Sequence, residues 1–166
     1  MDRSTSATWA KAAISSEPFD SDGPQRVLRA AEDELVDRYG GLADDELGLV
    51  AAMFDPPAGA FLVARSEGGV VGGAGVRPFE PEESVGEIKR LWVDPGWRRR
   101  GVGQRLMDEI ESAARRLGFC SLHLATGDQQ PEAVALYEAC GWVRRQVDHT
   151  GALLPDWHLQ FSKTFA

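Results

Sequence analysis

The stretch from Arg98 to Gly103 constrains the fold of this chain more strongly than any other part of the sequence. It reads Arg-Arg-Arg-Gly-Val-Gly and follows a strand-like run from Gly86 to Val93. The residues after it repeat their apolar side chains at helical spacing, at Leu106, Met107, Ile110, Ala114 and Leu117, which predicts a helix with one buried face. A loop of glycine and arginine that opens a helix gathers backbone N–H groups at the positive end of the helix dipole. We therefore expect an anion to bind here.

Two common phosphate-binding motifs do not fit this loop. The P-loop of nucleotide hydrolases needs a lysine followed by serine or threonine after its last glycine, and the loop has no such pair. The dinucleotide-binding fingerprint begins at Gly101 and Gly103 but has Leu106 where its third glycine belongs. What remains is the pattern Arg-x-x-Gly-x-Gly after a strand.

This pattern, together with a second one downstream, resembles the GNAT superfamily of N-acetyltransferases. Arg98, Gly101 and Gly103 match the phosphate loop of that family. This loop has Gln or Arg at its first position, Gly at its fourth and Gly or Ala at its sixth. The second signature of the family is an alanine, then Leu-Tyr, then glycine followed by an aromatic residue. It matches Ala133, Leu136-Tyr137 and Gly141-Trp142. The specific motifs lie between Glu87 and Trp142, and the order of the expected helices and strands matches the family over nearly the whole chain.

The resemblance implies an α+β fold of αβα layers, built as one domain from residues 1–166. It has a mixed, mostly antiparallel sheet of six or seven strands and about four helices. The fourth and fifth strands splay apart, and the pantetheine arm of acetyl-CoA lies in the cleft between them. The pattern of the sequence predicts strands at 8–14, 61–65, 70–79, 86–93, 121–125, 142–147 and 158–165. It predicts helices from 21–24 to 40–41, at 44–54, after Gly103 and at 131–139. It also predicts a bulge or a close backbone approach at the glycines at 72–75, and a loop at 79–84.

The resemblance also implies how acetyl-CoA, the cosubstrate, would bind. Backbone groups of the strand end should pair with the pantetheine amides, as in strand addition. The loop should surround the pyrophosphate, and Gln130 stands where many members have an asparagine that holds the pantetheine. The expected cofactor-binding residues are Leu91, Trp92, Val93, Arg98, Arg99, Arg100, Gly101, Val102, Gly103, Gln104 and Gln130. Arg99 occupies a position where most members have glycine, a departure that we expect to affect the shape of the loop.

Glu87 is the expected general base, because it falls where one branch of the family places its catalytic glutamate. Strand alternation puts Glu87 on one face with Lys89, Leu91 and Val93. The alternative is that Glu87 forms a structural ion pair with Lys89 or Arg77.

Tyr137 is the expected general acid, since the family directs a tyrosine hydroxyl from this position toward the CoA sulfur. The alternative to this role is that Tyr137 is an aromatic residue that only packs on the sheet. His123, in the strand predicted at 121–125, is an alternative base.

The expected reaction is direct attack of a small-molecule primary amine on acetyl-CoA in a ternary complex. The alternatives are a protein lysine or N-terminus as acceptor, or a non-catalytic acetyl-CoA-binding module. The net charge of −8 argues against general binding to nucleic acid. Residues 1–85 hold 16 acidic and 7 basic side chains, which would attract a cationic amine or serve only solubility.

The remaining composition narrows the class of protein. No run is apolar enough to cross a membrane and no signal peptide is evident, so we expect a cytoplasmic protein without membrane partners. The two cysteines are expected to be reduced, and the three histidines have no metal-ligand spacing. Family members often form homodimers, but no exposed stripe in the sequence identifies an interface.

Overall fold

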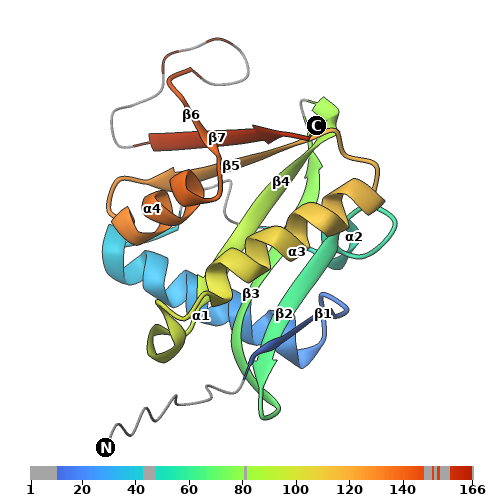
Figure 1. Ribbon diagram of the computed structural model, residues 1–166, viewed down its shortest axis with the longest axis vertical. Helices are drawn as coiled ribbons and strands as arrows, with labels where there is room; N and C mark the ends of the chain where they lie inside the picture. Colours follow the sequence, from blue (N-terminus) through green and yellow to red (C-terminus); the bar gives the residue numbers. More distant parts are fainter. Residues whose placement is uncertain are drawn as a thin grey trace, which may run out of the picture.

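The computed structural model describes residues 11–42, 48–80, 82–147, 151, 153 and 158–165. In these residues the chain forms one seven-stranded sheet in the order β1-β2-β3-β4-β5-β7-β6. The pairing of β4 with β5 is parallel and the other pairings are antiparallel. Helices cover both faces of the sheet (Figure 1). The predicted mixed sheet of an α+β fold is therefore confirmed.

The first helix ends where the sequence predicts. Helix α1 spans Asp22–Tyr39, and Gly40 caps it with a φ of 77°, a conformation that glycine adopts without steric strain. The strand before it, β1, is Ala13–Ser16; part of the strand predicted at 8–14 lies outside the described residues. Helix α2 is only Ala51–Phe54. The prediction of a helix through residues 48–50 is wrong, because Gly48 has a φ of 74° and Val50 is extended.

The central hairpin is longer than predicted. Strands β2 (Ala60–Ser66) and β3 (Gly69–Phe79) are joined at the expected turn, and β4 spans Glu82–Val93. The loop predicted at 79–84 is too long, since Phe79 pairs with Glu82 and residues 82–84 belong to β4; residue 81 lies outside the described residues. Glutamate is depleted in strands, but residues 82–84 are exposed at the end of the sheet, where charged side chains keep contact with water.

The second half of the chain follows the predicted order. A 3₁₀ turn, Pro95–Trp97, leads to α3 (Val102–Arg116), β5 (Ser121–Gly127) and α4 (Pro131–Ala139). The two closing strands are shorter than predicted: β6 is Val143–Arg145 and β7 is His158–Thr164.

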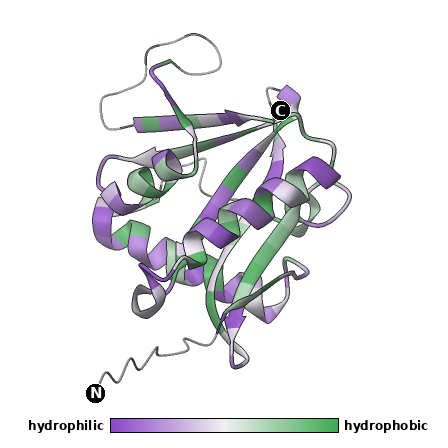
Figure 2. Cartoon of the chain, in the orientation of Figure 1, coloured by the Kyte–Doolittle hydropathy of each residue, from purple (hydrophilic) through white to green (hydrophobic). Residues whose placement is uncertain are grey.

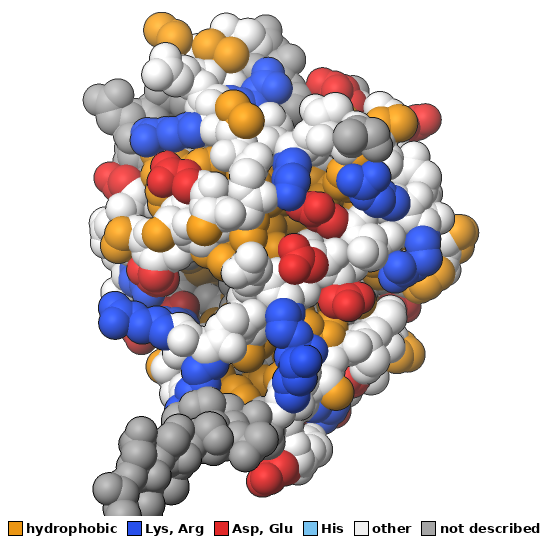
Figure 3. All heavy atoms as spheres, in the orientation of Figure 1, with side chains coloured by type: hydrophobic (Ala, Val, Ile, Leu, Met, Phe, Trp, Pro, Cys, Tyr) orange, Lys and Arg blue, Asp and Glu red, His pale blue; other side chains and the backbone are white. Residues whose placement is uncertain are grey.

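Two apolar clusters hold the sheet between its helices. On the α3 side, Leu106, Met107 and Ile110 are fully buried against the strands. On the α1 side, Phe54 lies 5.9 Å from Phe61, centroid to centroid, in an edge-on contact. Figure 2 shows the result: β2 is mainly hydrophobic, while α3 alternates between hydrophobic and hydrophilic residues. Acidic and basic side chains are interspersed over the face that carries α3 (Figure 3).

Candidate active site

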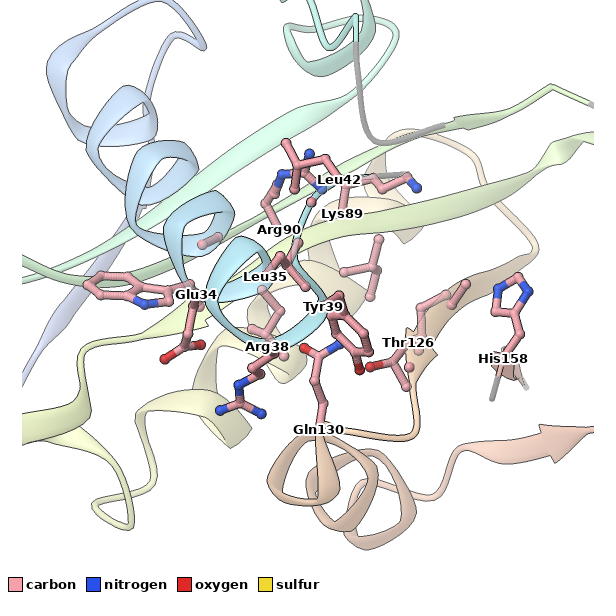
Figure 4. Close-up of a pocket in the computed structure, with 18 of the residues that line it drawn as sticks. Glu34, Leu35, Arg38, Tyr39, Leu42, Lys89, Arg90, Thr126, Gln130 and His158 are labelled. Atoms are coloured by element: carbon pink, nitrogen blue, oxygen red, sulfur yellow. The ribbon is translucent and has the colours of Figure 1, made fainter. Parts of the chain in front are cut away.

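A cavity lies where β4 and β5 diverge. These strands pair only from Val85–Glu87 to Ser121–His123, after which β5 continues beside β7. A cavity of about 520 Å³ opens beyond the last pair. Its wall comes from the strand residues 88–92 and 124–127, from the end of α1, and from Gln130, Tyr137 and His158. Figure 4 shows side chains from α1, β4 and β5 directed into this space. The predicted splay of the fourth and fifth strands is therefore present.

A β-bulge in β4 overturns the predicted alternation of its side chains. Arg90 has a φ of 58°, and the register of β3 and β4 shifts between Gly73 and Gly75. An extra residue in one strand turns the following side chains to the opposite face. Leu91 and Val93 consequently pack in the α3-side cluster that contains Ile88, while Trp92 packs on the α1 side. The prediction that Glu87 shares a face with Leu91 and Val93 is wrong.

Glu87 is held by an arginine from the neighbouring strand. It is 7% exposed, its Oε1 accepts a hydrogen bond from Nε of Arg77 at 2.9 Å, and the same oxygen forms an ion pair with Nη2 of Arg77 at 2.7 Å. The Nζ atom of Lys89 lies 3.9 Å from the same oxygen. The ion pair expected as the alternative is therefore present, and Glu87 does not contribute to the described wall of the cavity. Its role as a general base stays a prediction.

Tyr137 reaches the cavity from α4. It is 6% exposed and its ring packs 5.5 Å from that of Phe161 and 6.2 Å from that of Trp142. Burial raises the pKa of Tyr137 well above its ordinary value, so the phenol stays protonated at neutral pH. Tyr137 therefore packs on the sheet, which was the alternative to its role as general acid. It also lines the cavity, and its hydroxyl can donate a proton.

The arginine and glycine loop leaves the start of α3 open to a ligand. Gly101 is its N-cap, with a φ of 80° and no side-chain cap. The first N–H groups of a helix have no acceptor within it, so those of Val102, Gly103 and Gln104 can bind an anion. Arg99 has a φ of 61°, in the region that glycine occupies without strain. The loop thus forms its tight turn with an arginine at the position where family members commonly have glycine.

The arginine side chains of the loop also have structural contacts. Arg98 donates through Nε to the carbonyl oxygen of Val93 at 2.9 Å and pairs through Nη2 with Glu34 of α1. Arg100 lies over the ring of Trp97 at 5.2 Å. Arg98 therefore ties the loop to the end of β4 and to α1, and a direct contact of its side chain with a phosphate stays a prediction.

Sequence reasoning missed a bridge that closes the rim of the cavity. The hydroxyl oxygen of Tyr39 accepts a hydrogen bond from the N–H of Gln129 at 3.1 Å, and Arg38 donates to the carbonyl oxygen of Gln129 at 2.8 Å. Arg38 also pairs with Glu132. These contacts join the end of α1 to the start of α4, about ninety residues along the chain, as the positions of Tyr39 and Gln130 in Figure 4 illustrate. No local pattern could have indicated them.

Other candidate residues lie away from the cavity. His123 is 2% exposed, its ring lies 4.6 Å from that of Phe79, and it is the strand partner of Glu87. Cys120 is exposed and Cys140 is half-buried, and both are free cysteines. In the described residues there is no group of three or more potential metal ligands, and no described helix has the length and apolar character needed to span a membrane.

Comparison with known proteins identifies the family. Residues 25–142 match the sequence model of the acetyltransferase (GNAT) family. The chain belongs to this family. Membership of the GNAT family, which the two sequence motifs predict, is thereby confirmed. Acetyl-CoA is the acetyl donor of this family.

Two relatives and two solved structures illustrate the similarity. The chain is 42% identical to IAA acetyltransferase of Azospirillum brasilense over 85 residues, 51% of this chain and 55% of the relative. It is 32% identical to an uncharacterized N-acetyltransferase of Escherichia coli (strain K12) over 121 residues, 70% of this chain and 72% of the relative. The chain thus matches about half the length of the first relative and about seven tenths of the second.

The fold of this GNAT chain is shared with distant structures. A GNAT acetyltransferase from Staphylococcus aureus superposes with a TM-score of 0.71 at 16% identity, covering 92% of this chain and 99% of that one. An acetyltransferase from Bacillus subtilis in complex with CoA superposes with a TM-score of 0.64 at 16% identity, covering 94% and 100%.

Proposed function

We propose that this GNAT chain transfers an acetyl group from acetyl-CoA to a primary amine of a small molecule, by direct attack in a ternary complex. The observation that carries the proposal is the cavity between the diverging strands β4 and β5, with the protonated hydroxyl of Tyr137 in its wall. Two strands that separate leave backbone groups on the inner edge of each, where an extended ligand can add as a strand.

The proposed position of acetyl-CoA follows from this geometry. The diphosphate would bind the N–H groups of Val102, Gly103 and Gln104, because Gly101 supplies no side chain to cap them. The pantetheine arm would then run along the edge of β4 at residues 91–93, past Gln130, whose side chain lines the cavity. The thioester would end beside Tyr137.

The proposed chemistry needs two proton transfers. The neutral amine attacks the carbonyl carbon of the thioester, the carbon–sulfur bond breaks, and the sulfur leaves as a thiolate. Tyr137 would donate its proton to that thiolate. Glu87 would accept a proton from the amine through a water molecule, since it does not lie in the described wall of the cavity. Its ion pair with Arg77 keeps the carboxylate in a fixed position.

A small acceptor is supported by how the rim is built. The bridge from Arg38 and Tyr39 to Gln129 holds the end of α1 against the turn before α4. The cavity is thus bounded on one side by elements that are tied together, which favours an acceptor small enough to enter it. Among the relatives is an amino-acid acetyltransferase of Pseudomonas syringae, 30% identical over 69% of this chain and 29% of the relative. Its name supports a small amine as the class of acceptor.

Initial-rate kinetics with acetyl-CoA and a panel of primary amines tests the proposal. The panel includes peptides with a free N-terminus or a lysine, the release of CoA thiol is followed, and products are identified by mass. We expect acetylated small amines and intersecting double-reciprocal lines, the pattern of a ternary complex. Acetylation of the peptides alone, parallel lines that indicate an acetyl-enzyme, or no transfer to any amine would contradict it.

A further inference from the structure

Four charged side chains form one network at the rim of the cavity. Arg98, in the loop before α3, pairs with Glu34 of α1. Arg38, one turn further along α1, pairs with Glu132 of α4. The two pairs are also coupled, because Glu34 favours the charged form of Arg38 and Arg98 favours that of Glu132.

The network joins α1 to both elements that flank the proposed path of the cofactor. Glu34 and Arg38 line the cavity, and Figure 4 shows both side chains extending from the end of α1 in the same direction. Arg98 comes just before the start of α3, and Glu132 lies in the first turn of α4. A cofactor that runs from the start of α3 past Gln130 therefore meets these charges.

Arg98 is anchored at one point and only loosely held at the other. Its Nε donates to the carbonyl oxygen of Val93 at 2.9 Å, and its Nη2 donates to Glu34. The side chains of Arg98 and Glu34 are 30% and 32% exposed, and ion pairs that reach solvent are weak. Arg98 can therefore give up Glu34 at small cost while the contact with Val93 keeps its guanidinium at the end of β4.

An anion at the start of α3 would compete with Glu34 for this guanidinium. The N–H groups proposed to bind the diphosphate, those of residues 102–104, follow Arg98 on the same short segment, and Gly101 supplies no side chain to cap them. A diphosphate carries more negative charge than one carboxylate, and arginine binds phosphate oxygens with two parallel hydrogen bonds. The diphosphate is thus the stronger partner for Arg98.

We infer that Glu34 is a positioning residue that holds Arg98 until the cofactor binds, and that the diphosphate of CoA then takes its place. This inference rests on the proposed function, which puts the diphosphate at the start of α3. The exchange frees the end of α1 from the loop, while Arg38 still ties α1 to Glu132. Glu34 therefore lowers the affinity for CoA, and by recapturing Arg98 it speeds the release of CoA as a product.

Calorimetric titration with CoA tests the inference, because it measures binding apart from turnover. The variant is Glu34→Gln, which removes the charge and keeps the length of the side chain. The control is Asp33→Asn, which removes an exposed acid from the same helix outside the wall of the cavity. Arg98→Gln, alone and combined with Glu34→Gln, completes a double-mutant cycle. Circular dichroism checks that each variant is folded, and stopped-flow displacement measures the dissociation rate of CoA.

The expected result is tighter binding that depends on Arg98. Glu34→Gln should bind CoA about 2- to 5-fold more tightly than the wild type, the range of a solvent-exposed ion pair, and release it more slowly. The gain should shrink at high salt, because salt screens exposed charges. It should vanish when Arg98 is also replaced, and Asp33→Asn should match the wild type.

Two results would overturn the inference and leave the proposed function standing. Equal or weaker binding of CoA by Glu34→Gln would show that Glu34 does not compete with the ligand. The same gain in the Arg98→Gln background would assign the effect to the shape of the cavity instead of to the exchange. In either case the wild type would still bind CoA and acetylate amines, whereas no binding of CoA by the wild type would end both proposals.

Discussion

Replacing Tyr137 with phenylalanine isolates the proposed proton donor from its packing role. The ring contacts with Phe161 and Trp142, at 5.5 and 6.2 Å between centroids, do not need the hydroxyl. Loss of that one oxygen should change the free energy of unfolding by about 1 kcal/mol at most. A general acid contributes at least about 100-fold to the rate, which corresponds to about 2.7 kcal/mol in the barrier. The effect on turnover should therefore clearly exceed the effect on stability.

Single-turnover measurements of CoA thiol release are the suitable assay, because slow product release cannot then conceal the chemical step. We expect Tyr137→Phe to react about 100-fold more slowly with unchanged affinity for acetyl-CoA. Tyr39→Phe removes the same atom from the other tyrosine of the chain. It should lose about 1 kcal/mol of stability with its hydrogen bond to Gln129, but keep most of its turnover. A wild-type rate in Tyr137→Phe would refute the acid role.

Three further predictions concern the rim, the base and alkaline pH. Gly127→Ala would place a Cβ 2.1 Å from the hydroxyl oxygen of Tyr39, so it should destabilise the fold by about 1–3 kcal/mol in thermal unfolding. The control Gly41→Ala, whose Cβ meets open space, should keep the wild-type stability. Equal melting temperatures for the two variants would argue against the close contact between the end of α1 and the turn before α4. Glu87→Gln should lower kcat by about 100-fold at neutral pH and change the pH–rate profile, whereas an unaltered profile would remove Glu87 from the mechanism. Because burial raises the pKa of Tyr137, the folded state holds that proton more tightly than the unfolded state, so the free energy of unfolding should fall as the pH rises above about 10. In denaturant titrations, Tyr137→Phe should lose this pH dependence. An identical loss of stability in the wild type and the variant would contradict the assignment.

Much of the fold could be predicted because its signals are local. The end of α1 at Gly40 and the extent of α4 at Pro131–Ala139 depend on residues whose backbone preferences act over a few positions. The start of α3 could also be predicted, since glycine at the N-cap and apolar spacing in the helix both lie within one segment.

The parts of the site that could not be predicted depend on contacts between distant segments. The glycines at 72–75 predict an irregularity, and the register of β3 and β4 does shift between Gly73 and Gly75, but the extra residue lies in β4 at Arg90. The pattern of one strand does not show which of two paired strands carries the extra residue. Because of this bulge, Glu87 and Leu91 lie on opposite faces of the sheet, although the alternation of the strand places them on the same face. The bridge from Tyr39 to Gln129 likewise joins positions that no periodicity relates.

A crystal structure of the protein with CoA tests the central claim most directly. The account predicts CoA in the cleft between β4 and β5, with diphosphate oxygens about 2.7–3.2 Å from the backbone nitrogens of Val102, Gly103 and Gln104 and the sulfur beside Tyr137. CoA bound outside this cleft, or with its diphosphate away from the start of α3, would contradict it.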